Sequence, residues 1–106
     1  MPIRQITAPE LKTLIDAGTA FQFADVRTEG EREIAHIDGS RLLDQAYHDE
    51  LMALDRATPI VFQCHHGMRS QSAAEYFAGR GFTNLSNLIG GIDAWSALVD
   101  GDVPRY

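Results

Sequence analysis

The spacing of apolar residues changes repeatedly along this chain, which predicts an alternation of strands and helices. Short runs rich in β-branched and aromatic residues predict strands, and apolar residues three or four positions apart predict helices. The predicted strands are 21–26, 40–43, 60–63 and 84–89. The predicted helices are 8–17, 47–54, 70–80 and 92–98, and the charged segment 28–34 is expected to form a turn or a short helix. This alternation indicates an α/β domain with a mainly parallel sheet.

The signals that start and stop a helix are clearest around the first predicted helix. Thr7 is a good N-cap, Pro9 suits the first turn, and Glu10 completes a capping box. Gly18 is a suitable residue for the left-handed position after the last turn. We expect Gly81 to end the helix at 70–80 in the same way.

Composition narrows the class of protein. A chain of 106 residues predicts one domain, spanning 1–106. The net charge of -6 argues against nucleic acid and against an anionic membrane surface as partners. No apolar run approaches the length of a membrane span, and the first residues are too polar for a signal peptide. One cysteine cannot form an internal disulfide, so we expect a reducing compartment and a cytoplasmic location.

The single cysteine, Cys64, lies in the stretch F-Q-C-H-H-G-M-R-S-Q, between a predicted strand and a predicted helix. Parallel sheets bind ligands outside the carboxyl ends of their strands. A tight turn that leads into a helix gathers backbone N–H groups around one point, and the helix dipole adds partial positive charge. Such surroundings lower the pKa of a thiol from about 8.5 to roughly 3.5–7.5. We therefore interpret Cys64 as a nucleophile, the alternative being a buried structural thiol.

The residues that follow Cys64 each have two possible roles. Gly67 allows close approach of a ligand to the backbone, or is an ordinary turn glycine. Arg69 adds positive charge if its side chain turns inward, or is solvated in the first helical turn. Ser70 is an N-cap, a donor to the sulfur, or both. We expect Met68 to lie at the rim of the pocket.

The histidines raise the question of a metal site. His65 and His66 could bind an ion together with Cys64, but three adjacent residues rarely point at one ion, and a structural zinc site has four ligands at wider spacing. His36 and His48 form no matching pair. We therefore predict no metal, with one of His65 and His66 lining the pocket and the other facing solvent.

Four segments resemble the motifs of the rhodanese-like sulfurtransferases, and the resemblance covers nearly the whole chain. They correspond to the patterns D-V-R, H-I-x-G-A/S, C-x-x-G-x-R-S and G-G-x-x-A-W. The segments are Asp25-Val26-Arg27, His36-Ile37-Asp38-Gly39-Ser40, Cys64-His65-His66-Gly67-Met68-Arg69-Ser70 and Gly90-Gly91-Ile92-Asp93-Ala94-Trp95. One departure is Ala35, which stands where a glycine commonly precedes the histidine. Four motifs in this order form a specific signal.

The resemblance implies a rhodanese-like α/β fold, with a mainly parallel central sheet of about five short strands and helices on both faces. It implies sulfur transfer from a donor such as thiosulfate, through a persulfide on Cys64, to cyanide, a thiol or a protein acceptor. The loop residues His65, His66, Gly67, Met68, Arg69 and Ser70 would bind the substrate. No cofactor is implied, and we expect a monomer.

The other matching residues are expected to support the site rather than react. Asp25 and Arg27 would form an ion pair that fixes geometry. Glu31 lies where a glutamate in this family often pairs with that arginine. His36 is expected to be a hydrogen-bonded scaffold residue, and Trp95 to pack the last helix on the sheet, at helical spacing from Ile92 and Leu98.

Two other functions compete with sulfur transfer. Phosphatases and arsenate reductases related to this family have five residues between the cysteine and the arginine, whereas Cys64 and Arg69 enclose four. The shorter loop makes a smaller cradle, which suits a sulfur atom better than a phosphoryl group. The second alternative is a non-catalytic module that binds a partner or carries sulfur, and the presence of Cys64 weighs against a purely non-catalytic role.

Overall fold

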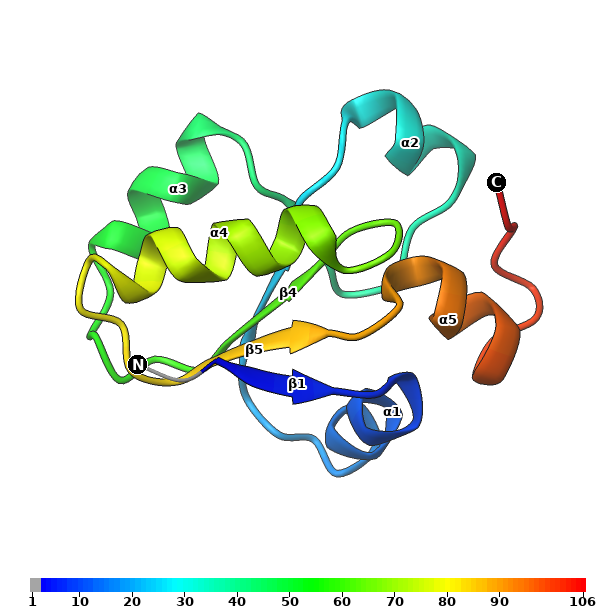
Figure 1. The fold of residues 1–106 in the computed structure, drawn as a ribbon, viewed down its shortest axis with the longest axis horizontal. Helices are drawn as coiled ribbons and strands as arrows, with labels where there is room; N and C mark the ends of the chain where they lie inside the picture. The colour runs from blue at the N-terminus through cyan, green and yellow to red at the C-terminus, as the bar shows by residue number, and fades with distance from the viewer. Residues whose placement is uncertain (1–2) are drawn as a thin grey trace.

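Five short strands form one parallel sheet in the computed structural model, which describes residues 3–106 (Figure 1). The strands are β1 (Arg4–Ile6), β2 (Gln22–Asp25), β3 (Arg41–Leu42), β4 (Ile60–Gln63) and β5 (Leu85–Leu88), and their order across the sheet is β1-β5-β4-β2-β3. The helices are α1 (Ala8–Asp16), α2 (Glu29–Ile34), α3 (Gln45–Met52), α4 (Met68–Ala78) and α5 (Gly91–Leu98). The expected α/β class and parallel sheet are confirmed.

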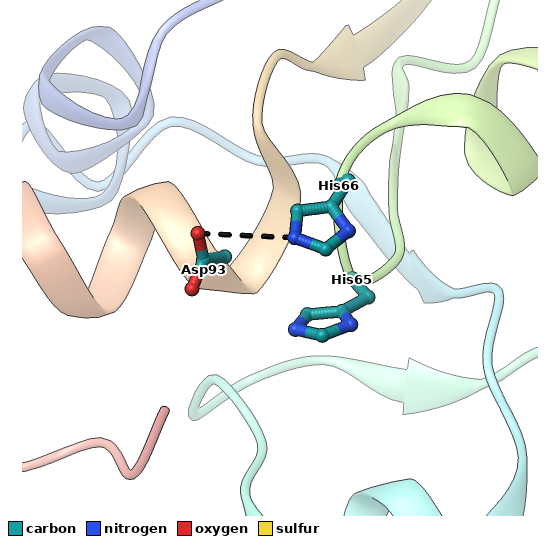
Figure 2. A group of neighbouring side chains, drawn as sticks. All are labelled: His65, His66 and Asp93. Atoms are coloured by element: carbon teal, nitrogen blue, oxygen red, sulfur yellow. Dashed lines mark ion pairs between the residues drawn. The ribbon is translucent and has the colours of Figure 1, made fainter. Parts of the chain in front are cut away.

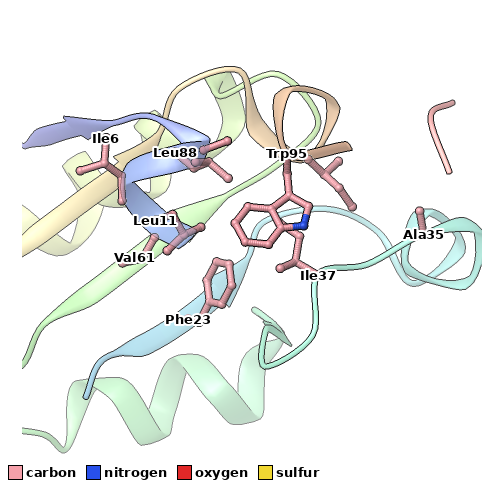
Figure 3. Packing of buried hydrophobic residues seen from close by; sticks show 10 residues of the cluster. Ile6, Leu11, Phe23, Ala35, Ile37, Val61, Leu88 and Trp95 are labelled. Carbon is pink, nitrogen blue, oxygen red and sulfur yellow. The ribbon is translucent and has the colours of Figure 1, made fainter. Parts of the chain in front are cut away.

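Helices cover both faces of the sheet, as the resemblance implies. On one face, α1 and α5 bury the inward side chains of β1, β2, β4 and β5, and Trp95 lies at the centre of this cluster among Phe23, Ile37 and Val61 (Figure 3). On the other face, α3 and α4 pack Leu51 and Phe77 against the sheet. The alternation of side chains along each strand produces this division.

Local signals set where several helices begin. Thr7 caps α1 and Thr28 caps α2, and in both cases a glutamate three residues later completes a capping box. Gly18 has a φ of 70°, as expected for the residue that follows the end of α1. The segment 28–34 is therefore a short helix and not merely a turn.

The predicted ends of some helices were wrong. α3 ends at Met52, so Leu54 lies outside it, and α4 ends at Ala78, before the predicted stop at Gly81. α4 also begins at Met68 with Gly67 as its N-cap, which places Ser70 in the first turn and not at the cap. Leu98 is 66% exposed, so the last helix turns only Ile92 and Trp95 of the predicted apolar set inward.

The strand β1 was not predicted from the pattern of the sequence. Its three residues, R-Q-I, bury only Ile6, too little to give a recognisable period. Its hydrogen-bonding partner, β5, lies about eighty residues away in the chain, with Ile6 opposite Leu88. Tertiary pairing therefore creates this edge strand.

The connections of the sheet place one crevice at its carboxyl edge. The chain leaves β2 toward the edge strand β3 and returns to β4 on the other side of β2. The segments after β2 and β4 therefore diverge, which is where open α/β sheets bind ligands. Among residues 3–106, no helix combines the length and the apolar character needed to cross a membrane.

Candidate active site

Cys64 follows the last residue of β4, and its thiol faces the start of α4. The sulfur accepts hydrogen bonds from the N–H of Gly67 at 3.1 Å and from the N–H of Ser70 at 3.4 Å, and the Ser70 hydroxyl lies 3.3 Å away. Gly67, the N-cap of α4, provides no side chain for this purpose. The sulfur of Cys64 therefore takes the place of a capping side chain and satisfies N–H groups that a helix start leaves free.

Opposing effects act on the pKa of the Cys64 thiol. Burial raises it, because a charged sulfur loses hydration. Hydrogen bonds from the Ser70 hydroxyl and from the N–H groups of Ser70, Gly67 and His66 lower it and outweigh burial, so the pKa lies below the ordinary value for cysteine. Because the thiolate is the nucleophilic form, the loop activates this residue.

Asn87 on β5 ties the loop to the sheet. Its amide donates to the carbonyl of Gly67 at 3.1 Å and to the side chain of Gln5 at 3.0 Å, so its Oδ1 faces the Ser70 hydroxyl at 2.5 Å. That hydroxyl carries one proton, which it donates either to Asn87 or to the sulfur of Cys64. Neither Asn87 nor Gln5 was predicted. The signal that could have identified Asn87 is its position as a polar residue within the buried strand L-S-N-L.

Gly91 brings the start of α5 against the backbone of the same loop. The N–H of Ile92 donates to the carbonyl of Cys64 at 2.8 Å, and the N–H of Asp93 donates to the carbonyl of His65 at 3.2 Å. A Cβ at Gly91 would lie 2.2 Å from the carbonyl oxygen of Cys64. The glycine pair before α5 therefore permits a close approach to the cysteine loop, beyond making a turn.

Arg69 reaches across the opening of the loop to Glu31 on α2. Its two Nη atoms donate to the two carboxylate oxygens at 2.7 and 2.9 Å. These hydrogen bonds hold the pKa of Glu31 well below its ordinary range and raise the pKa of Arg69. The expected pairing of Glu31 with Arg27 is wrong. The guanidinium of Arg27 donates instead to Asp25 and to the carbonyl of Ala35.

Asp25 anchors two arginines at the end of β2. Its fully buried carboxylate accepts from Nε and Nη2 of Arg27, both at 2.7 Å, and from Nη1 of Arg32 at 2.8 Å. Arg27 also donates to the carbonyl of Ala35 at 2.9 Å. The ion pair of Asp25 and Arg27 is confirmed, whereas Arg32 was not predicted as its second cation. Together these bonds fix the segment that carries Glu31.

Tyr106 contacts three of these groups. Arg27 donates to its hydroxyl at 2.8 Å, and the hydroxyl donates to Glu31 at 2.7 Å. Its ring stacks on His65 with centroids 4.1 Å apart and planes at 10°. The sequence offered no local signal for this position, because the contacts join residues 41 or more positions apart.

His65 and His66 lie beside the loop with Asp93 of α5 (Figure 2). Their rings stack at 4.0 Å and 27°, so the in-plane lone pairs of the nitrogens do not converge on one point. Both carboxylate oxygens of Asp93 accept from Arg105, at 3.0 and 3.2 Å. The three ligand atoms lie within 4.8 Å of one another, but this geometry does not match a preformed metal site.

The remaining predicted site residues lie around the loop or away from it. His66 is exposed, and with Met68, which is 82% exposed, it lines a hollow of about 450 Å³ beside the loop. His65 is half-buried, and the described residues offer its Nε2 no hydrogen-bond partner. His36 is exposed and lines a different hollow, next to Trp95, with its Nδ1 3.4 Å from the carbonyl of Arg32.

A larger hollow, of about 510 Å³, lies on the face covered by α1, where Phe21, Ile60 and Asn84 mark the amino ends of the strands. Its lining divides evenly between apolar side chains and polar or charged ones, and it contains neither Cys64 nor any residue of its loop. The chemistry of the chain therefore lies at the opposite end of the sheet.

Comparisons with known proteins identify the family and the fold of the chain. A model of the rhodanese-like domain matches residues 7–98. A thiosulfate sulfurtransferase GlpE from Ectopseudomonas mendocina is 42% identical over 74 residues, 69% of this chain and 68% of that protein. The GlpE of Pseudomonas aeruginosa is 34% identical over 100 residues, 93% of this chain and 89% of that protein. A rhodanese-like domain protein from Staphylococcus aureus superposes with a TM-score of 0.77 at 27% identity, covering 98% of this chain and 99% of that one.

Proposed function

The chain belongs to the rhodanese-like domain family, and we propose that it is a thiosulfate sulfurtransferase that carries the transferred sulfur as a persulfide on Cys64. The observation that carries this proposal is the sulfur of Cys64, held by the N–H groups of Gly67 and Ser70 at the carboxyl end of β4. Thiosulfate is proposed as the substrate because relatives of this chain are named thiosulfate sulfurtransferases.

The first half-reaction forms the persulfide. The Cys64 thiolate attacks the sulfane sulfur of thiosulfate, a new S–S bond forms, and the bond to the sulfonate sulfur breaks. Sulfite leaves with the electron pair of that bond, so no external oxidant is needed. The lowered pKa of Cys64 supplies the thiolate. Arg69 provides a cation for the anionic donor. Its guanidinium would then donate hydrogen bonds both to the donor and to the carboxylate of Glu31.

The second half-reaction removes the outer sulfur from the persulfide on Cys64. A nucleophile such as cyanide or a thiolate attacks the outer sulfur, takes it, and returns Cys64 as a thiolate. In the interval between the two steps, N–H groups of the loop from His65 to Ser70 stabilise the negative charge of the persulfide. Since the chain has one cysteine, the acceptor comes from outside and the kinetics should be ping-pong.

The residues around the loop have supporting roles in this proposal. Asp25, Arg27 and Arg32 fix the segment after β2, and Glu31 holds Arg69 in place. Residues 1–106 act as a single domain. A cytoplasmic location stays a prediction from the single cysteine.

A phosphatase or arsenate reductase fits the loop less well. Its N–H groups would have to surround a tetrahedral oxyanion beyond the sulfur. Here two N–H groups point at the sulfur of Cys64 itself, at 3.1 and 3.4 Å. This arrangement supports a loop whose N–H groups bind a sulfur atom.

The test is intact-protein mass spectrometry after incubation with thiosulfate, repeated after cyanide is added. We expect a gain of one sulfur atom in the wild type, its loss on cyanide with release of thiocyanate, and no gain in Cys64→Ser. Circular dichroism of the variant controls for folding. A folded Cys64→Ser protein that still transfers sulfur would overturn the proposal, as would a wild type that gains none. In the second case, activity on a phosphate ester or on arsenate would identify the alternative.

A further inference from the structure

The segment that follows α5 folds back over the cysteine loop. It is anchored by the two hydrogen bonds from Arg105 to Asp93, and Val103 packs against the core beneath α5. Its end lies beside α2 and α5 although α2 belongs to the first third of the chain (Figure 1). The segment 100–106 therefore joins α5 to α2 beside the cysteine loop.

The side chain of Tyr106 contacts Arg27, Glu31 and His65, which lie on three different segments near the cysteine loop. The hydroxyl bridges Arg27 and Glu31, and Glu31 in turn holds Arg69. The ring covers His65, the neighbour of Cys64. Arg69 lies within electrostatic reach of both Cys64 and Tyr106, since each of them contributes to raising its pKa after the larger effect of Glu31. Tyr106, Arg69 and the thiol therefore belong to one site.

The protonation of Tyr106 suits this bridging role. Burial raises the pKa of the phenol above its ordinary value, an effect that the hydrogen bond from Arg27 opposes and that the neighbouring Glu31 carboxylate reinforces. The phenol therefore keeps, at neutral pH, the proton that it donates to Glu31.

The thiol itself is covered. Cys64 is 1% exposed, and its loop N–H groups enclose the sulfur on the side of α4. Glu31, Arg69, His65 and Tyr106 contact one another beside this loop. A displacement of the segment 100–106 would remove the contacts of Tyr106 with Glu31 and His65 and open this side of the loop to a donor or acceptor.

We propose that Tyr106 determines which acceptors reach the persulfide on Cys64: compact nucleophiles enter past it, and bulky thiols react only when the segment 100–106 moves aside. This inference rests on the proposed sulfur transfer. In the step that it governs, the thiolate of the acceptor attacks the outer sulfur, one S–S bond forms, another breaks, and Cys64 leaves as a thiolate.

The experiment compares two neutral thiols of different size. Protein loaded with thiosulfate and freed of donor is mixed with 2-mercaptoethanol or with the blocked tripeptide acetyl-Gly-Cys-Gly-amide, and loss of the sulfur is followed by mass. In Tyr106→Ala we expect the tripeptide to react about tenfold faster and 2-mercaptoethanol to change less than about threefold. Tyr106→Phe keeps the stack on His65 and loses the hydroxyl bridge, so we expect an intermediate effect.

Two further variants separate the proposal from loss of stability. Arg105→Gln loosens the same segment and leaves Tyr106 intact, so it should favour the tripeptide in the same direction. Tyr76→Ala removes a tyrosine of α4 whose hydroxyl contacts His48, and should change neither rate. Equal changes for both thiols in Tyr106→Ala, or none, would overturn the inference.

A second readout does not depend on sulfur transfer. Alkylation of Cys64 by iodoacetamide and by a bulky N-aryl maleimide measures access to the thiol directly. We expect Tyr106→Ala to accelerate the maleimide more than iodoacetamide. If the wild type gains no sulfur from thiosulfate, the proposed function fails, and this comparison still decides whether Tyr106 limits access.

Discussion

At the scale of single residues, the reactivity of Cys64 depends on a balance between burial and hydrogen bonding. Burial alone would make the thiol inert, since it opposes ionisation. The donors from Gly67 and Ser70 reverse that effect. Ser70 is the most informative of them, because both its N–H and its hydroxyl lie within hydrogen-bond distance of the sulfur. A change at its side chain removes one donor and leaves the backbone donors in place.

We therefore predict that Ser70→Ala raises the pKa of the Cys64 thiol. Alkylation by iodoacetamide, measured from pH 5 to 10, should slow about threefold to tenfold at pH 7. The two proteins should react at similar rates at high pH, where both thiols are ionised. Ser72→Ala, at an exposed position of the same helix, is the matched control. Coincident pH profiles for wild type and Ser70→Ala would show that the hydroxyl donates to Asn87 and not to the sulfur.

At the scale of elements, the site is formed where the starts of α4 and α5 meet the end of β4. α4 presents its first N–H groups to the sulfur, and α5 presents its own to the carbonyls of Cys64 and His65. The loop is thus held from both sides by helix starts, each of which begins after a glycine with positive φ. The close contact of Gly91 with the Cys64 carbonyl makes this arrangement sensitive to a single methyl group.

Gly91→Ala should destabilise the protein and displace the loop. The new methyl group would meet the carbonyl oxygens of Cys64 and His65, so we expect a loss of about 2–5 kcal/mol in the free energy of unfolding. Urea denaturation measures this loss, and the alkylation rate of Cys64 reports on the loop. Gly18→Ala is the matched control: its φ is also positive, but the space around it is open, so only the backbone cost of about 1 kcal/mol applies. Equal losses in the two variants would contradict a steric role for Gly91.

At the scale of the whole molecule, the sheet separates two clusters of apolar side chains, and its carboxyl edge collects the polar groups. The edge strands β1 and β3 have three and two residues, which makes them poor templates for extending the sheet into another chain. Among residues 3–106, the exposed large apolar side chains are spread over several elements, from Ile15 in α1 to Leu98 in α5. The net charge of -6 adds mutual repulsion between copies.

These features predict a monomer in solution. Size-exclusion chromatography with light scattering, in the presence of a reductant, should give the mass of one chain over about a hundredfold range of concentration. The reductant excludes dimers that are linked through Cys64. A mass that rises toward two chains would contradict the prediction and would identify an interface, for which Met68 and Ile89, both exposed beside the 450 Å³ hollow, are the first residues to change.

Local patterns were enough to predict much of this protein. Capping residues located α1, and the apolar runs located β2, β4 and β5, whereas the charged segment 28–34 left a turn and a short helix equally open. The same runs placed Cys64 at the end of a buried strand, where its loop would face a helix start. These features depend on residues within a few positions of one another. The local sequence therefore determines the period of their side chains and their backbone hydrogen bonds.

Tertiary structure determined which distant residues contact one another. Glu31 pairs with Arg69 and not with Arg27, Asn87 reaches the loop from β5, and Tyr106 returns to cover His65. β1 is a strand only because β5 pairs with it. In each case the two partners are separated by tens of residues, so no local spacing specifies their meeting. They meet because burying both faces of the sheet brings the strand ends and the helix starts to one edge.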